Sequence, residues 1–226
     1  MSGIARYDGL AEWYRDWSLG SDTMYRDSTE CLTEMVGAGP GRCLDLACGG
    51  GRMVPHLIEL GWMVVGCDVS ADQLRLARQQ HGEVAEFVQA DGAQLPFAEC
   101  GFDAVVTALA HTDVDDLAAV FGESARVLRP GGTLVHVGSH PCFCSPVAVR
   151  AEEDRMVLHR GYSDTRWRTA GPAIGDGIRR RAGVRHVPLA ELLNAIAGAG
   201  LVLVAAREAN DDDFPRLLAL RAERPL

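Results

Sequence analysis

The sequence lacks the features that would mark a membrane, secreted or nucleic-acid-binding protein. The longest apolar stretches, such as Leu201–Ala206, are strand-sized and fall far short of the roughly 18 residues that a membrane-spanning helix needs. The first ten residues contain no apolar core, so no secretory signal is expected. A net charge of −9 and a pI near 5.2 disfavour a general affinity for nucleic acid or anionic lipid. These absences favour a cytoplasmic protein with a small-molecule ligand.

Cysteine pairs with the spacing of metal ligands are also missing. The seven cysteines are an odd number, and most lie within apolar runs, where a free thiol packs as a small hydrophobe. Cys142 and Cys144 are separated by a single residue and have no second pair, which argues against zinc. The cysteines therefore indicate a reducing compartment, and no metal site is predicted.

The residues that are present predict one α/β domain. The 226 residues, of which 47% are hydrophobic and 23% charged, suit a globular enzyme of one domain, since domains run to roughly 100–200 residues. Strand-like and helix-like segments alternate between residues 42 and 140, which predicts a mostly parallel sheet with helices on both faces. Strands are expected at 42–48, 63–70, 85–91, 102–110 and 133–139, and helices at 52–60, 71–82 and 113–132.

The remaining segments are expected to flank this core. Residues 1–41 are predicted to form an N-terminal helical cap, and residues 141–187, which show no clean periodicity, a cap or lid over an acceptor site. A helix at 189–199 leads into the strand 201–209, a polar loop at 210–213 and the strand 216–222. These last two strands read as a closing antiparallel hairpin within residues 188–226.

Polar residues follow four consecutive expected strands. Asp45, Asp68, Asp91 and His111 each stand at such a strand end. Parallel sheets bind ligands at the carboxyl ends of their strands, so these side chains are predicted to share one site. The glycines at 49–51 allow a ligand to approach the backbone closely, and Asp68, 23 residues beyond Asp45, has the spacing of a carboxylate that binds ribose hydroxyls.

A dinucleotide-binding fold shares these features and is the main competitor. Three details weigh against it: Val54 stands where the glycine pattern requires glycine or alanine, Arg52 begins the next helix, and Asp45 would face a pyrophosphate unfavourably. A carboxylate, glycines and a second carboxylate instead suit a ligand with a cationic amino acid end and a nucleoside end.

The motifs "LDLACGGGR", "VVGCDVS", "VQADGAQLPF", "FDAVVTALAH" and "ARVLRPGGTLVHVG" occur in this order within about residues 42–138. This set resembles the ordered motifs of class I S-adenosylmethionine-dependent methyltransferases. The resemblance implies a Rossmann-like, seven-stranded, mostly parallel sheet, with S-adenosylmethionine as cofactor and S-adenosylhomocysteine as its product. The segment "RHVPLAELLNAIAGAGLVLV" and the N-terminal "YDGLAEWY" are also similar to flanking parts of small-molecule members of this class.

The resemblance also implies roles for individual residues. Asp45 and the backbone at 47–49 would hold the methionine end of the cofactor, Asp68 the ribose hydroxyls, and Asp91 the adenine amino group. Tyr7 and Tyr14 would face the cofactor, with Tyr7 counted on the acceptor side. The expected cofactor-binding residues are Tyr14, Asp45, Ala47, Cys48, Gly49, Gly51, Asp68, Val69, Asp91, Gly92, Ala93 and Ala108. Taken alone, Asp45 and Asp91 could equally brace a loop or a turn.

Methyl transfer to an oxygen needs a base unless the acceptor arrives deprotonated, and the positions of two histidines fit that task. His111, after the fourth strand, is the first candidate, and the acidic run 113–116 beside it is expected to favour its protonated form. His140, just past the fifth strand, is the second. An oxygen acceptor, such as a secondary metabolite, is therefore favoured over nitrogen or carbon.

Segment 141–187 contributes the expected acceptor pocket. It carries Phe143, Tyr162 and Trp167 among several arginines, which could form an anion-tolerant aromatic pocket or simply a solvated basic face. The expected partner is a small molecule rather than nucleic acid or a membrane, in a monomer or homodimer. A noncatalytic S-adenosylmethionine-binding protein, an enzyme of a different reaction and a nicotinamide-dependent oxidoreductase remain as alternatives.

Overall fold

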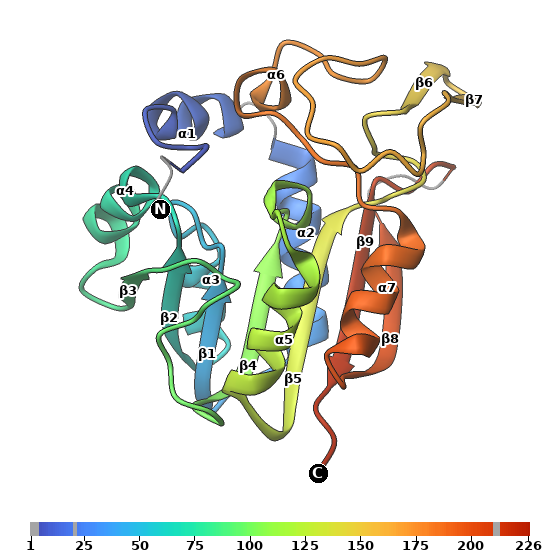
Figure 1. Cartoon of the computed structure of the whole chain (residues 1–226). Coiled ribbons are helices and arrows are strands. Elements are labelled where there is room, and N and C mark those ends of the chain that lie inside the picture. Colours follow the sequence, from blue (N-terminus) through green and yellow to red (C-terminus); the bar gives the residue numbers. More distant parts are fainter. Residues whose placement is uncertain (1–4, 20–21, 210–212) are drawn as a thin grey trace.

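The computed structural model describes residues 5–19, 22–209 and 213–226, and a seven-stranded sheet lies at its centre (Figure 1). The strand order is β3-β2-β1-β4-β5-β9-β8, and the first five strands are parallel, whereas β9 runs antiparallel to both of its neighbours. The predicted α/β fold with its closing hairpin is therefore confirmed. The strands are β1 (Gly41–Leu46), β2 (Trp62–Asp68), β3 (Glu86–Gln89), β4 (Phe102–Ala108), β5 (Leu128–Ser139), β8 (Val202–Ala209) and β9 (Leu217–Glu223).

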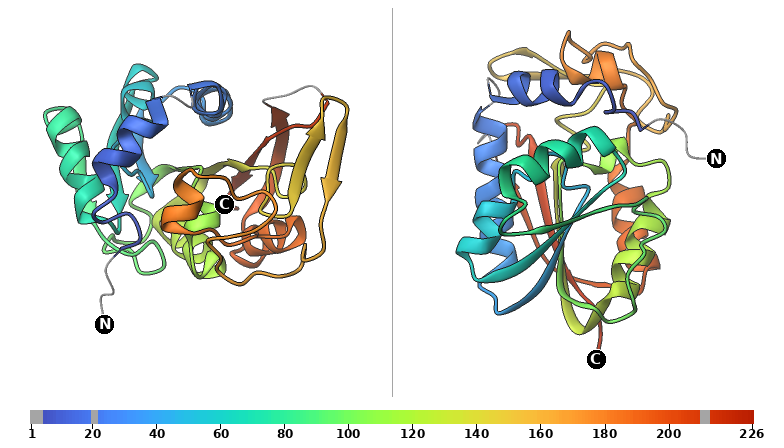
Figure 2. Two further views of the ribbon diagram at one scale, coloured as in Figure 1. Left: turned by 90° about the horizontal axis from the view of Figure 1, so that it is seen from above. Right: turned by 90° about the vertical axis from the view of Figure 1, so that its left-hand side faces the viewer.

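The central strands are apolar because helices cover both of their faces. On one face, α2 (Asp22–Val36) and α3 (Val54–Glu59) bury Leu32 and Leu57 against Val106 and Val135. On the other, α5 (Leu117–Val127) and α7 (Leu189–Gly198) enclose a second cluster, which includes Phe121, Leu192, Leu134 and Leu220. Figure 2 shows these two helical layers on either side of the sheet.

Short polar side chains fix where two helices begin. Ser70, predicted as a cap, accepts a hydrogen bond from the backbone N–H of Gln73 at the start of α4 (Ala71–His81), which packs on β2 and β3. Asp116 accepts one from the N–H of Ala119 and starts α5. This helix ends at Val127, so residues 129–132, predicted as its end, extend β5 instead.

A further layer lies over the carboxyl ends of the parallel strands (Figures 1 and 2). It consists of α1 (Ala11–Leu19), the hairpin of β6 (Ala148–Glu152) and β7 (Arg155–Leu158), and α6 (Ile178–Ala182). The hairpin was not expected, because its strands are short and largely exposed and carry no clear alternation. That this layer opens as a lid stays a prediction, and residues 210–212 of the predicted polar loop lie outside the described residues.

The second N-terminal helix packs against the sheet itself, which gives a test of its contribution to stability. Leu32 of α2 is fully buried, so Leu32→Ala should lower the free energy of unfolding by about 2–5 kcal/mol through lost burial and a residual cavity. Urea denaturation followed by circular dichroism would measure the change. Glu30→Ala, an exposed position on the same helix, is the control and should stay within about 0.5 kcal/mol of the parent. Equal stability of the two variants would contradict the packing of α2.

Candidate functional site

A cavity of about 1410 Å³ opens at the carboxyl ends of the parallel strands, below the covering layer. It lies where the strand order reverses between β1 and β4, the point at which open α/β sheets bind ligands. Its volume exceeds the roughly 300–1,000 Å³ of an ordinary ligand pocket, so it has room for two small molecules side by side. Its walls come from the ends of β1 to β5, from the N-terminal segment and from the start of α5.

The carboxylate of Asp45 is the most unusual group in this cavity. Asp45 lies within β1 between β2 and β4 and is only 2% exposed, and its Oδ2 atom is buried without a hydrogen-bond partner. Burial, together with the nearby charge of Asp68, raises the pKa of Asp45 to about 7. A buried acceptor with no internal partner suits a ligand group that carries positive charge and donates hydrogen bonds.

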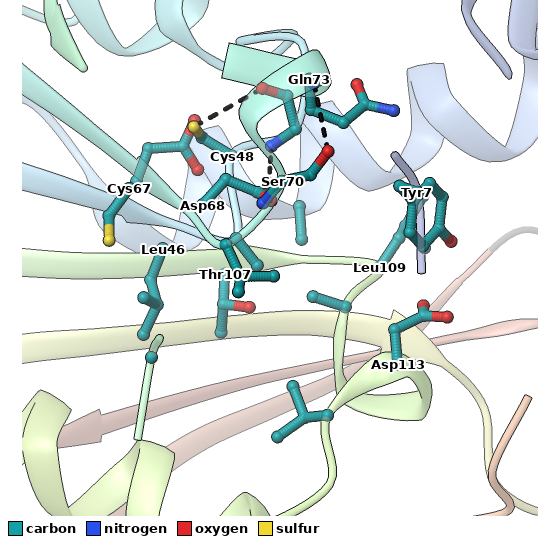
Figure 3. Close-up of a pocket in the computed structure, with 18 of the residues that line it drawn as sticks. Tyr7, Leu46, Cys48, Cys67, Asp68, Ser70, Gln73, Thr107, Leu109 and Asp113 are labelled. Carbon is teal, nitrogen blue, oxygen red and sulfur yellow. Dashed lines mark hydrogen bonds between the residues drawn. The ribbon is translucent and has the colours of Figure 1, made fainter. Parts of the chain in front are cut away.

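Asp68, at the end of β2, braces the glycine loop from the neighbouring strand (Figure 3). Its Oδ2 accepts a hydrogen bond from the N–H of Gly49 at 2.8 Å, and its Oδ1 accepts one from the N–H of Ser70 at 2.8 Å. An ionised carboxylate has about four acceptor positions, so these two bonds leave capacity for the hydroxyl groups of a ligand. Burial raises the pKa of Asp68, although its backbone hydrogen bonds oppose that shift.

The backbone at two strand ends adopts a left-handed conformation beside the cavity. Ala47 after β1 has φ 58° and Leu109 after β4 has φ 57°, a region that non-glycine residues seldom occupy. Such strain costs of order 1–3 kcal/mol and concentrates at ligand sites, where the surrounding structure imposes it. Gly49, with φ 52°, adopts the same conformation without that cost.

An exposed apolar side chain follows the second strand. Val69 is 52% exposed and lines the cavity, as do Asp91, Gly92 and Ala93 after β3. The Oδ1 atom of Asp91 accepts a hydrogen bond from the N–H of Ala93 at 2.9 Å, which shapes this turn. The arrangement offers a flat ring an apolar contact on one side and a carboxylate at its edge.

His111 lies deeper in the cavity, beyond the end of β4. It is 2% exposed and forms the start of a 3₁₀ turn, His111–Asp113. Burial, together with His136 and Arg179, lowers the pKa of His111 well below its ordinary value, so the imidazole is neutral at pH 7. The expectation that the acidic run 113–116 favours the protonated form was wrong, because the Asp113 carboxylate pairs with Arg179 at 3.1 Å instead.

Three tyrosines from the N-terminal segment and α2 close one side of the cavity. Tyr7 and Tyr14 pack edge to face with ring centroids 5.2 Å apart, and the hydroxyls of Tyr14 and Tyr25 are hydrogen-bonded to each other. Figure 3 shows the Tyr7 side chain directed toward that of Asp113. Burial raises the pKa of Tyr7 and Tyr14, so both phenols stay neutral and present hydroxyl groups rather than charge.

Arginine and aromatic side chains join the two parts of the covering layer. Arg6 lies 3.9 Å from the ring centre of Trp167, and Arg181 lies 4.2 Å from that of Trp13. Cation–π contacts of this kind contribute roughly 0.5–1 kcal/mol each where they are exposed. The N-terminal segment and segment 141–187 therefore cover the cavity together, as one layer.

Several predicted site residues lie elsewhere. Gly51 is not part of the cavity wall, because it packs against Ala77 and His81 of α4. His140 also lies outside the wall, and both of its ring nitrogens are used: Nε2 contacts Glu208 at 2.7 Å and Nδ1 accepts from the N–H of Cys142. The three aromatic residues predicted for the acceptor pocket are likewise absent from the wall, namely Phe143, Tyr162 and Trp167.

These aromatic rings are held within the covering layer. Phe143 packs on His140 with ring centroids 4.8 Å apart, and the Tyr162 hydroxyl accepts a hydrogen bond from the N–H of Leu189. The other predicted residues do line the cavity: His111, Tyr7, Tyr14, Asp45, Ala47, Cys48, Gly49, Asp68, Val69, Asp91, Gly92, Ala93 and Ala108. What each of them binds stays a prediction.

The sequence did not single out several polar residues of the wall. Tyr25, Gln73 and His136 lie in regular elements, where each could equally be read as part of a helix or strand face. A histidine inside the apolar strand "TLVHVGS" was the one available signal, since buried histidines need a reason. In the described part of the chain, no group of three histidine, cysteine or acidic residues could hold a metal ion, and no helix is long and apolar enough to cross a membrane.

Residues 44–136 match a protein family described as "Methyltransferase domain". The chain is also 40% identical over 119 residues to a demethylmenaquinone methyltransferase of Beutenbergia cavernae, an alignment that covers 52% of this chain and 48% of the relative. The chain thus spans about half the length of the curated relatives it matches.

Solved structures share the fold at low sequence identity. An S-adenosylmethionine-dependent methyltransferase from Mesorhizobium loti superposes with a TM-score of 0.71 at 23% identity, over 91% of this chain and 100% of the other. The [4+2]-cyclase SpnF superposes with a TM-score of 0.65 at 19% identity, over 88% of this chain and 80% of the other. The fold is therefore one on which different reactions are found.

The buried carboxylate of Asp45 predicts a stability that depends on pH. Because its pKa rises from 3.8 to about 7 on folding, the folded chain binds more protons between these values, and stability is lost as the pH rises toward 7. At pH 8, Asp45→Asn should therefore raise the free energy of unfolding by ~2–4 kcal/mol, and at pH 4 by much less. Urea denaturation at both pH values measures this. The exposed Asp154→Asn is the control, and an equal gain at both pH values would rule out ionisation as the cause.

Proposed function

We propose that the chain carries a class I S-adenosylmethionine-dependent methyltransferase domain and transfers the methyl group of this cofactor to a small-molecule acceptor, favouring an oxygen atom. The observation that carries the proposal is the unpartnered, buried carboxylate of Asp45 beside the glycine loop. It matches the ammonium group at the amino acid end of the cofactor, whereas a nicotinamide dinucleotide would bring a pyrophosphate to this carboxylate. Asp45 therefore disfavours an oxidoreductase.

The residues along the cavity fit the remaining parts of the cofactor. Asp68 has spare acceptor positions for the ribose hydroxyls, and Val69 offers an exposed apolar contact for the adenine ring. Asp91 and the backbone of Gly92 and Ala93 stand at the edge of that position. When bound, S-adenosylmethionine supplies an electrophilic methyl group and a neutral thioether as leaving group.

His111 is proposed to take the proton that a hydroxyl acceptor must lose. Its imidazole is neutral at pH 7, so it is in the form that accepts a proton, which is released to solvent after the transfer. Its lowered pKa makes it a weak base, so proton removal should accompany formation of the new carbon–oxygen bond rather than precede it. His140 is the less suitable candidate, because both of its nitrogens are bonded.

Calorimetry with S-adenosylhomocysteine tests the cofactor assignment. An ionised Asp45 is needed to bind the ammonium group, so the affinity should rise by about tenfold per pH unit below pH 7 and level off above it. Asp45→Asn should bind much more weakly and lose this pH dependence. The Asp154→Asn control should behave as the parent does. Tight, pH-independent binding by Asp45→Asn would contradict the proposed position of the ammonium group.

Substitution of His111 tests the proposed base. Once screening of phenols, hydroxylated and carboxylated metabolites has identified an acceptor, His111→Ala should lower kcat by roughly 10²–10⁴-fold while the affinity for S-adenosylhomocysteine stays unchanged. His186→Ala, a buried histidine outside the cavity wall, is the matched control and should retain turnover. Full turnover of His111→Ala across the pH range would mean that the acceptor arrives already deprotonated.

Two other reactions have specific support, one at a different acceptor atom and one without methyl transfer. The curated relatives are named demethylmenaquinone methyltransferases, which favours a quinone-type acceptor and methylation at carbon as the second candidate. The likeness to a [4+2]-cyclase leaves a reaction without methyl transfer as the third. The carbon or oxygen position of the new methyl group, read by NMR of the product, separates the first two. Turnover without formation of S-adenosylhomocysteine would indicate the third.

A further inference from the structure

A second histidine lines the same cavity and has no role in the proposed function so far. His136 lies in the middle of β5, opposite Thr107 of β4 and Leu220 of β9. It is 1% exposed, and its ring packs edge to face against Phe121 and against His111, with centroids 5.8 Å and 5.0 Å away. One imidazole from β5 and one from the turn that follows β4 thus meet at the deep end of the cavity.

Three of the four ring nitrogens of this pair lack partners within the protein. Both ring nitrogens of His136 and the Nδ1 of His111 are buried without a hydrogen bond. Buried polar atoms are nearly always paired, and each exception calls for a water, an ion or a ligand. Three such atoms on two touching rings, both in the wall of one cavity, indicate that a polar group of a ligand completes them.

A glycine makes the meeting of the two rings possible. A Cβ atom at Gly138, two residues beyond His136 on β5, would lie 2.3 Å from Nδ1 of His111 and 2.8 Å from Nε2 of His136. Contacts this short do not occur, so any side chain at this position would displace both rings. The absence of a side chain at Gly138 therefore keeps the two nitrogens on the same side of the strand, next to each other.

The charge state of the pair limits what can bind there. Burial lowers the pKa of His136 to about 4, and His111 is neutral as well. Each neutral imidazole offers one N–H donor and one nitrogen acceptor. Arg179, paired with Asp113 close by, adds positive charge and disfavours a cationic ligand. The matching group both donates and accepts hydrogen bonds and is neutral or anionic, which describes a hydroxyl oxygen.

We propose that His111 and His136 together form a subsite for a hydroxyl oxygen of the acceptor, on an apolar ring that packs against Phe121 and Leu117. The proposal rests on the proposed function and narrows its acceptor to a neutral or anionic hydroxylated aromatic compound. His136 is then assigned the binding of this oxygen, and removal of its proton stays with His111, as in the proposed function.

The test uses 1-naphthol as the probe and naphthalene as its matched control without oxygen. The ring nitrogens of the histidines are observed by ¹⁵N NMR of the full chain, with and without S-adenosylhomocysteine. We expect 1-naphthol to shift the nitrogens of His111 and His136 and to bind roughly 5–50-fold more tightly than naphthalene, as two hydrogen bonds allow. Equal affinities, or nitrogens that do not shift with 1-naphthol, would overturn the subsite.

Substitutions of His136 test whether this residue accounts for the preference for 1-naphthol. His136→Phe should lose the larger part of the preference for 1-naphthol over naphthalene, because only the bond to His111 remains, while His136→Gln should keep more of it because it retains a donor and an acceptor. His186→Phe is the matched control, since His186 is as buried and also has an unpartnered Nε2 but lies outside the cavity wall. An unchanged preference for 1-naphthol in a folded His136→Phe would contradict the proposal.

Binding of S-adenosylhomocysteine and binding of 1-naphthol test the proposed function and the subsite separately. If S-adenosylhomocysteine fails to bind while 1-naphthol still shifts both histidines, the subsite stands and the cofactor assignment falls. If the cofactor product binds and 1-naphthol does not, the methyltransferase assignment stands and the acceptor is of another class. If His136→Phe does not fold, the measurements on the parent chain decide by themselves.

Discussion

The buried carboxylate of Asp45 is the constraint on which the site depends. Its position within β1, with β2 and β4 on either side, keeps water away and leaves one oxygen without a partner. The neighbouring Asp68 adds like charge at the end of β2 and holds the glycine loop by its N–H groups. The ionised Asp45 carboxylate destabilises the folded chain at neutral pH, and a bound cationic ligand would offset that destabilisation. The carboxyl edge of the sheet therefore favours the binding of a cationic ligand that donates hydrogen bonds.

The covering layer over the carboxyl ends of the parallel strands encloses part of the cavity. Two segments far apart in the sequence form it, and arginines stacked on tryptophans join them. Segment 141–187 contains nine arginines and five acidic residues, whereas the whole chain has a net charge of −9, so positive charge is concentrated over the cavity. Of these arginines, Arg179 reaches the turn after β4 and pairs with Asp113. This pair explains why the acidic run after β4 does not raise the pKa of His111.

The proposed cofactor and acceptor sites occupy different parts of the cavity. The ends of β1, β2 and β3 supply carboxylates, a strained loop and an exposed valine, whereas β4 and β5 supply neutral imidazoles and apolar side chains. The ordered motifs extend over both sets, but the resemblance implies no ligand role for either histidine. This division fits a fold in which one ligand is shared among many proteins and the second differs among them.

The sequence by itself determined the sheet, its closing hairpin and the strand-end residues Asp45, Asp68 and Asp91, because alternation and strand-end polarity are local patterns that one parallel sheet brings to one edge. Only the tertiary structure decided which side chains of segment 141–187 face the cavity. Phe143 packs on His140 and Tyr162 on His186, both outside the cavity wall, and a segment without periodicity gives no sign of which way a ring points. Long-range packing also places His136 of β5 against His111 of the turn after β4, in the space left by the missing side chain of Gly138, and no local pattern encodes this contact.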